Sequence, residues 1–303
     1  MAELARLRVA GRDVATCLDG ASLDATLAPR PYLHPVQTLA GRVVTGAQPA
    51  DHRWHLGVSV AIQDVDGHNL WGGRTYLRDR GYTWRTDHGR IVHAGFDELA
   101  EDDFVQRLRW LTGTGEELLT ERRTVRASPA PDGWELELLT ELANPTDREL
   151  RLGSPATNGR TGAGYGGLFW RLPPATAPTV QALGGASAPS GPSGAGGVVA
   201  EGEAAVHGLV APVLVWTERG PDPFTLVLVA TDAAADPWFV RVDGYPGVGS
   251  QLAAVHPVAV PPGAAVSRGV RVLVADGALD RAAIAAWSHR RGPADGRVAY
   301  PPP

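Results

Sequence analysis

Residues 120–140, TERRTVRASPAPDGWELELLT, carry the pattern that decides the fold. Side chains alternate in character on both sides of Pro131-Asp132-Gly133, a tripeptide typical of tight turns. After the turn, Trp134, Leu136 and Leu138 alternate with Glu135, Glu137 and Leu139. A period of two residues is the signature of a β-strand, so the sequence predicts a β-hairpin over residues 117–143.

The same short alternating segments recur along the chain, separated by turn dipeptides and tripeptides. Further strands are predicted at 55–63, 90–97, 103–111, 213–218, 224–231, 237–243, 252–260 and 266–275. A helix is predicted only over Leu279–Arg290, with Asp280 as its N-cap. We therefore expect an all-β protein, a large antiparallel β-sandwich with one short C-terminal helix.

The predicted strands have the same kind of composition along the whole chain, and this bears on the domain organisation. We expect a single domain over residues 1–303, because no second compositional region follows the first. A Gly/Ser/Pro-rich stretch at about 184–200 is predicted to be a flexible loop, and the tail Tyr300–Pro303 is predicted to be disordered.

Composition excludes several classes of function. The 303 residues hold 28 basic side chains, and all of them are Arg. The absence of Lys excludes a Schiff-base enzyme, a pyridoxal phosphate enzyme and a P-loop nucleotide site. The net charge of −5 gives no basic footprint for nucleic acid, and the single Cys17 excludes a CxxC metal or redox motif.

The sequence also predicts where the protein resides. The first residues lack the uninterrupted apolar run of a signal peptide, and no stretch approaches 18 apolar residues. We therefore expect a cytoplasmic protein that does not cross a membrane. The oligomeric state is left open.

Histidines are concentrated in one part of the chain. Six of the nine lie between residues 34 and 93 (His34, His52, His55, His68, His88 and His93). The densest motif is Asp51-His52-Arg53-Trp54-His55, in which the two imidazoles can converge only if His52 lies in a turn before the strand. Imidazoles with a carboxylate suit Zn, Mn, Ni or Fe, so His34, His52, His55 and Asp51 are candidate ligands of a divalent metal. Acid–base or substrate contacts without a metal, with His52, His55 and His68 as catalytic residues, are the equal alternative. Purely structural histidines are the third.

Two glycine-rich motifs supply candidate substrate contacts. Gly67-His68-Asn69-Leu70-Trp71-Gly72-Gly73 combines an imidazole, an amide and an indole, the groups that sugar-binding clefts use. Residues 158–171 are expected to present Arg160 and Tyr165 from a loop before a strand that starts at Gly167. Asn69, Trp71, Arg160 and Tyr165 are therefore the predicted substrate-binding residues, with Arg160 able to hold a carboxylate or polarise a carbonyl.

A further motif, Asp236–Pro246, places Trp238, Val240 and Val242 on one face of a strand. We expect Trp238 to pack in the core and Tyr245 to be available to a pocket.

Taken in order, five stretches resemble a bacterial family that is labelled methane oxygenase PmoA and has no assigned function. They are RPYLHPVQTLAG (30–41), PADHRWHLGVSVA (49–61), GHNLWGG (67–73), GYGGLFWR (164–171) and PWFVRVDGYP (237–246). The resemblance spans about residues 28–275. It implies a β-sandwich of the aldose-epimerase or galactose-mutarotase kind, the supersandwich, and carbohydrate catabolism as the setting.

These observations favour a carbohydrate-active enzyme, a lyase, isomerase or hydrolase. Its substrate would be a sugar or an oxidised (keto) sugar glycoside, and its chemistry a histidine-based, metal-assisted or metal-free proton transfer. One alternative is a non-catalytic sugar-binding or regulatory module. Another, which the family label suggests, is a metal-dependent oxygenase with His52, His55 and Asp51 as a facial triad.

Overall fold

The predicted hairpin is the centre of the larger sheet. In the computed structural model, which describes residues 1–184, 197–231 and 236–290, β10 (Glu117–Ala130) pairs with β11 (Gly133–Ala143) from Thr120↔Ala143 to Ala130↔Gly133. The connecting turn is two residues long, and Asp132 adopts a φ of 66°. Short polar residues tolerate this left-handed conformation, and Pro131 before it fixes the negative φ that the first turn position requires.

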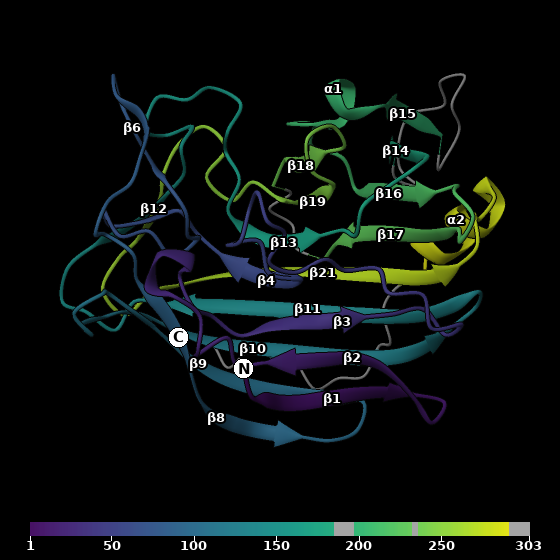
Figure 1. Ribbon diagram of the computed structural model, residues 1–303, viewed down its shortest axis with the longest axis horizontal. Coiled ribbons are helices and arrows are strands. Elements are labelled where there is room, and N and C mark those ends of the chain that lie inside the picture. Colours follow the sequence, from purple (N-terminus) through teal and green to yellow (C-terminus); the bar gives the residue numbers. More distant parts are fainter. Residues whose placement is uncertain (185–196, 232–235, 291–303) are drawn as a thin grey trace.

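Two large antiparallel sheets form the sandwich (Figure 1). The nine-stranded sheet has the order β15 (Val198–Glu201), β14 (Pro178–Leu183), β16 (Val213–Glu218), β17 (Phe224–Ala230), β21 (Ala265–Asp276), β11, β10, β9 (Asp103–Leu111) and β8 (Arg90–Leu99). The seven-stranded sheet has the order β1 (Glu3–Val9), β2 (Arg12–Leu18), β3 (Tyr32–Val36), β4 (Val58–Ala61), β13 (Gly167–Arg171), β19 (Gly247–Ser250) and β18 (Trp238–Arg241). The predicted all-β class and large antiparallel sandwich are confirmed.

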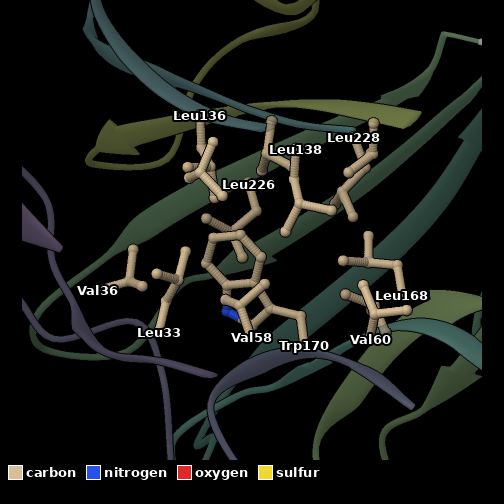
Figure 2. Packing of buried hydrophobic residues seen from close by; sticks show 14 of the residues in the cluster. Leu33, Val36, Val58, Val60, Leu136, Leu138, Leu168, Trp170, Leu226 and Leu228 are labelled. Carbon is tan, nitrogen blue, oxygen red and sulfur yellow. The ribbon is translucent and has the colours of Figure 1, made fainter. Parts of the chain in front are cut away.

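The main core fills the space between these sheets. Figure 2 shows Leu33, Val58, Val60, Leu168 and Trp170 of the smaller sheet facing Leu136, Leu138, Leu226 and Leu228 of the larger one. Each of these side chains is at most 9% exposed. Their spacing of two residues along each strand is the alternation that the sequence shows, and burial of this apolar surface is what joins the sheets.

Two small sheets lie at the margins of the sandwich. One contains β20 (Val258–Val260), β12 (Leu150–Gly153) and β5 (Asp64–Val65), and the other is the hairpin of β6 (Thr75–Leu77) and β7 (Gly81–Thr83). In Figure 1 the β6–β7 hairpin stands at the end opposite the C-terminal helix.

The C-terminal helix α2 (Arg281–Ser288) confirms the prediction, with Asp280 as its N-cap. The Asp280 carboxylate accepts a hydrogen bond from the Ala283 amide at 2.8 Å, which satisfies one of the free donors of the first turn. Ile284 and Trp287 pack on the outer face of the nine-stranded sheet against Leu273. Among the described residues, neither α2 nor the single-turn helix α1 (Glu203–Val206) has the length and apolar character needed to cross a membrane. A short 3-10 turn, Ala25–Leu27, precedes β3.

Several predicted segments need correction. The strand predicted at 252–260 is confined to β20, because residues 252–256 form turns and bends. The loop predicted at about 184–200 ends earlier, since Val198–Glu201 pairs with β14 as β15. Residues 185–196 and the tail lie outside the described residues. The paired strands β1 and β2 and the helix α1 were not predicted.

Candidate functional site

A cavity of about 720 Å³ lies on the outer face of the seven-stranded sheet. Alternation along two strands creates this face. Leu168 and Trp170 of β13 point into the core, whereas Phe169 joins a separate apolar cluster with Phe239 of β18 and Trp71. Loops from residues 49–56 and 158–166 and the segment 70–84, which includes the β6–β7 hairpin, surround the cavity above this floor.

The walls of the cavity are largely aromatic. Trp71 lies 4.9 Å from both Tyr165 and Phe169 between ring centroids, and Trp54 meets Trp84 edge to face at 6.3 Å. Trp84 is 52% exposed, so its indole is available at the rim. The aromatic lining residues are Trp54, Trp71, Tyr82, Trp84, Tyr165, Phe239 and Tyr245.

The two histidines of the Asp51–His55 motif come together in the cavity. A turn spans the motif, because the His55 amide donates to the His52 carbonyl at 2.9 Å, well before β4 begins at Val58. The two imidazoles therefore stack with centroids 4.7 Å apart, the convergence that the sequence allowed only for a turn. Tyr245 packs against both rings, at 4.7 and 4.8 Å.

His52 forms a hydrogen-bonded pair with its neighbour. Its Nδ1 lies 2.7 Å from Asp51 Oδ2, and the imidazole side chain is 30% exposed. This hydrogen bond lowers the pKa of the Asp51 carboxyl group below its usual value. A carboxylate on Nδ1 places the proton of a neutral imidazole there and leaves Nε2 as the acceptor.

His55 lies deeper and is only 2% exposed. Its Nδ1 has no hydrogen-bond partner within the described part of the chain. Burial holds the pKa of His55 well below its usual value, and the nearby His52, Arg171 and Arg30 act in the same direction. His55 is therefore a neutral side chain at neutral pH, with a buried Nδ1 that has no partner among the described residues, in an aromatic enclosure.

A chain of hydroxyl groups forms another wall. The Tyr165 and Tyr82 hydroxyl oxygens lie 2.7 Å apart, Gln63 Nε2 donates to Tyr165 at 3.2 Å, and Arg160 donates to the Tyr82 hydroxyl. Burial and the adjacent Tyr82 raise the pKa of Tyr165 well above its usual value. Tyr165 thus stays protonated and can donate a hydrogen bond to a ligand oxygen.

The Gly67–Gly73 motif shapes the cavity from behind. The Asn69 side chain is fully buried, and its Oδ1 accepts from the amides of Trp71 and Gly72 at 2.9 and 2.8 Å. Its Nδ2 donates to the Thr75 hydroxyl at 3.0 Å. Asn69 does not line the cavity. Its side-chain amide forms an Asx turn that holds Trp71 in place. The position of Asn69 therefore does not support the prediction of a direct substrate contact.

Two glycines let this motif approach Trp54 closely. A Cβ on Gly73 would lie 2.5 Å from the Trp54 ring, and one on Gly72 would lie 2.6 Å from the Leu27 carbonyl oxygen. Both residues have positive φ values, 99° at Gly72 and 71° at Gly73. Glycine is needed here for close contact as well as for backbone conformation.

Arg30, which was not predicted, ties the loops together beneath the cavity. It is completely buried, and its guanidinium donates to the carbonyl oxygens of Trp54 and Trp71 at 2.9 and 3.0 Å. Further bonds reach Leu27, Ala28 and Ser59. Arg30 occurs in a motif that carries the family resemblance, but nothing in the sequence indicates which distant carbonyl groups it holds.

The remaining predicted site residues lie elsewhere. His34 Nδ1 bonds the Thr45 hydroxyl at 2.9 Å, and His68 lies in the turn after β5, so neither lines the cavity. Within the described residues, no group of three or more His, Cys, Asp or Glu side chains is arranged to hold a metal ion. The predicted set of His34, His52, His55 and Asp51 is not brought together, because His34 faces Thr45. The metal remains a prediction, and no step below depends on it.

The structure adds residues that the sequence did not single out. Gln63, Arg74, Tyr82, Trp84 and Arg53 line the same cavity. Tyr82 and Trp84 come from β7 and the residues after it, where short strands of half-buried residues give no strong pattern. Arg241 and Tyr245, which follow Trp238 in the sequence, also line the cavity, while Trp238 packs in the core as predicted.

Comparison with known proteins identifies a family without a known activity. Residues 5–288 match a family of unknown function, DUF6807. No curated protein matches the chain. The description of the matched family contains no oxygenase activity, so the methane oxygenase label remains a prediction.

Among solved structures, the similarities are distant. A putative aldose 1-epimerase from Escherichia coli aligns with a TM-score of 0.48 and 10% identity, covering 90% of this chain and 98% of that one. A galactose mutarotase related enzyme from Lactobacillus acidophilus gives 0.40 and 10%, covering 92% and 100%. The GH36 alpha-galactosidase AgaA from Geobacillus stearothermophilus, in complex with raffinose, gives 0.42 and 12%, covering 90% of this chain and 40% of that one. Similarity at this level carries no argument about activity, which has to come from the cavity itself.

Proposed function

We propose that this chain, which belongs to the DUF6807 family of unknown function, is a carbohydrate-active enzyme whose cavity binds a sugar and whose Asp51–His52 pair transfers a proton. The observation that carries the proposal is this hydrogen-bonded pair, placed in an aromatic cavity of about 720 Å³. Such a volume accommodates a small ligand, and an imidazole held by a carboxylate in a cleft is an arrangement suited to proton transfer.

Sugar binding is supported by the kinds of groups that line the cavity. Indole faces stack on the C–H bonds of a pyranose, and Trp54 and the exposed Trp84 supply such faces, while Trp71 packs against Tyr165 in the wall. The Tyr165 and Tyr82 hydroxyls and the His52 imidazole supply hydrogen bonds to sugar hydroxyls.

His52 is the proposed base. Asp51 on Nδ1 fixes the ring and stabilises the imidazolium that forms when Nε2 takes a proton. The group that loses the proton is a carbon next to the carbonyl of a sugar or a keto-sugar glycoside. The electron pair of that C–H bond moves to the carbonyl oxygen and gives an enolate.

The hydroxyl wall is the proposed partner of the enolate oxygen. Tyr165 remains protonated because its pKa is raised by burial, so it can donate to the developing negative charge. Arg160 acts on the same wall through the Tyr82 hydroxyl. Delivery of a proton from water to the opposite face, with His52 returning its own proton to solvent, gives an epimer. Departure of a leaving group from the next carbon, protonated by the His52 imidazolium, gives elimination, which in a glycoside cleaves the glycosidic bond.

Deuterium exchange tests this chemistry without knowledge of the final product. Methyl 3-keto-α-D-glucopyranoside would be incubated with the protein in D2O, and proton NMR would follow loss of the signals beside the carbonyl. We expect exchange above the solvent rate with the wild type, loss of at least about a hundredfold with His52→Gln, and a smaller loss with Asp51→Asn.

His34→Gln is the matched control, because His34 is a half-buried imidazole that bonds Thr45 and does not line the cavity. It should exchange deuterium like the wild type. Wild-type exchange that His52→Gln retains in full would contradict the role of His52.

A non-catalytic sugar-binding module is the second candidate, since the aromatic walls alone favour it. It predicts saturable binding of the same glycoside with no exchange in any variant. In that case His52 would serve as a hydrogen-bond donor or acceptor for the sugar.

A further inference from the structure

The charges that line the cavity are unbalanced. Four arginines, Arg53, Arg74, Arg160 and Arg241, face one carboxylate, Asp51. The chain as a whole has a net charge of −5, so the cavity is a positive region on a negative protein. A concave site with one sign of charge concentrates ligands of the opposite sign.

Three of these arginines have no carboxylate partner within 4.0 Å among the residues that the structure describes. Arg241 pairs with Glu203 at 3.4 Å, but Arg53, Arg74 and Arg160 form no ion pair. Arg160 instead lies over the Tyr82 ring at 4.9 Å, and Arg74 lies over Trp84 at 5.9 Å. Aromatic faces hold a guanidinium in place while leaving its N–H groups free to bind an anion.

Two further arginines add positive charge beneath the cavity. Arg30 and Arg171 are both buried, and their guanidinium groups donate to backbone carbonyls and one hydroxyl, with no carboxylate in the described chain within ion-pair distance. Burial lowers the pKa of Arg30 to about 9, which still leaves it charged at neutral pH. Charges in a poorly solvated region act over longer distances than exposed ones.

We propose that the cavity selects an anionic carbohydrate, and that Arg160 is a specificity-determining residue for the anionic group. This rests on the sugar site proposed above and names its substrate class. A guanidinium binds a carboxylate or a phosphate through two parallel hydrogen bonds, and both a sugar acid and a sugar phosphate present such a group. Arg160 is the strongest candidate because its hydrogen bond to Tyr82 joins it to the hydroxyl wall.

Tryptophan fluorescence provides the test, because three indoles line the cavity. The protein would be titrated with D-glucuronate, D-glucose 6-phosphate and D-glucose at low ionic strength. We expect at least one anion to bind about tenfold or more tightly than D-glucose, and about 0.5 M sodium chloride to remove most of this preference. Tighter binding of D-glucuronate identifies a carboxylate, and tighter binding of D-glucose 6-phosphate identifies a phosphate.

The variant Arg160→Gln should lose about tenfold or more in affinity for the preferred anion while changing the affinity for D-glucose by less than about threefold. Arg219→Gln is the control, because Arg219 is an exposed arginine in the turn after β16 and does not line the cavity. It should bind the anion like the wild type.

Three results would overturn the inference: equal or tighter binding of D-glucose, no binding of either anion, or an anion preference that Arg160→Gln retains. D-glucose binding without an anion preference leaves the sugar site standing and removes only the substrate class. An anion preference in a protein that catalyses no exchange does the reverse, because it supports the substrate class and contradicts the acid–base role.

Discussion

Buried arginines inside the sandwich are paired with carboxylates, whereas those below the cavity on its outer face are not. Inside the sandwich, Glu121 accepts two hydrogen bonds from Arg123, at 2.7 and 2.9 Å, and one each from Trp110 and Thr140, both at 2.8 Å. Below the cavity, Arg30 has no carboxylate in the described chain, and His55 Nδ1 has no partner.

A second buried ion pair, on the other side of the nine-stranded sheet, is matched in the same way. Arg271 donates to both Glu135 oxygens at 2.7 Å, and Trp287 of α2 donates to the same carboxylate at 3.1 Å. In both of these buried ion pairs the carboxylate is matched by a guanidinium, as expected because an unpaired buried charge costs several kcal/mol. Arg30 and Arg171 are the buried arginines of the described chain that lack a carboxylate partner, and both lie beneath the cavity.

The largest expected effect comes from breaking the interior pair. Arg123→Gln leaves the Glu121 carboxylate buried without its cation, so we expect a loss of about 3–5 kcal/mol in the free energy of unfolding. Urea denaturation measures it. Arg122→Gln is the control on the exposed face of the same strand, 3.9 Å from Asp97, and should cost less than about 1 kcal/mol. Similar losses for the two variants would contradict the importance of the buried pair.

A smaller effect is expected at the back of the cavity. Gly73→Ala places a methyl group 2.5 Å from the Trp54 ring, whereas Gly67→Ala, at a φ of 89°, meets nothing within 4 Å. Both variants strain a left-handed backbone, so their difference isolates the contact with Trp54, and we expect Gly73→Ala to cost about 1–3 kcal/mol more.

Urea denaturation and the tryptophan emission maximum measure this difference. Equal losses with unchanged emission would show that Trp54 moves away from the added methyl group freely.

The next effect is a pH dependence at His55. Its folded-state pKa is lowered mainly by burial, so between that value and the ordinary value near 6.5 the unfolded chain binds a proton that the folded chain does not. The stabilisation from a neutral His55 is therefore present above about pH 6.5 and is lost as pH falls toward the folded-state pKa.

Thermal unfolding at about pH 7.5 and pH 5 measures this loss for the wild type and for His55→Gln, which cannot titrate. The variant should lose less stability on acidification. An equal loss in both proteins would assign the pH dependence to the other histidines whose pKa values burial lowers, His34, His93 and His207.

The sequence predicted the features that depend on local pattern. Alternation located the central hairpin and eight further strands, some of them shorter in the structure, and Asp280 marked the start of α2. The sequence also indicated when His52 and His55 could come together, namely if His52 lies in a turn. The turn over residues 49–55 is a local feature, and in the structure the two imidazoles stack. The strands β1 and β2 were missed although Ala5, Leu7 and Val9 alternate with charged or polar residues, a signal that was present.

The remaining parts of the site depend on contacts between distant segments. Tyr82 reaches Tyr165 across 83 residues, and Arg30 reaches the Trp71 carbonyl across 41. No spacing in the sequence encodes such pairings. Asn69 was interpreted as a ligand contact because its chemistry fits a sugar, yet that same chemistry is used by the local backbone.

The smallest expected change in stability belongs to the residue with the largest expected effect on binding. Arg160→Gln removes an exposed guanidinium that has no ion pair among the described residues, so the free energy of unfolding should change by less than about 0.5 kcal/mol. This is the reverse of Arg123, and the contrast between the two arginines is the central claim.

Thermal unfolding of the wild type and Arg160→Gln, with and without the anion preferred in the fluorescence titration, tests this claim most directly. A ligand that binds the folded state raises the melting temperature. We predict equal melting temperatures without the anion and, at the same anion concentration, a clearly smaller rise in Arg160→Gln than in the wild type. A variant that melts several degrees lower without ligand and keeps the full rise would contradict it, because Arg160 would then support the fold and not the ligand.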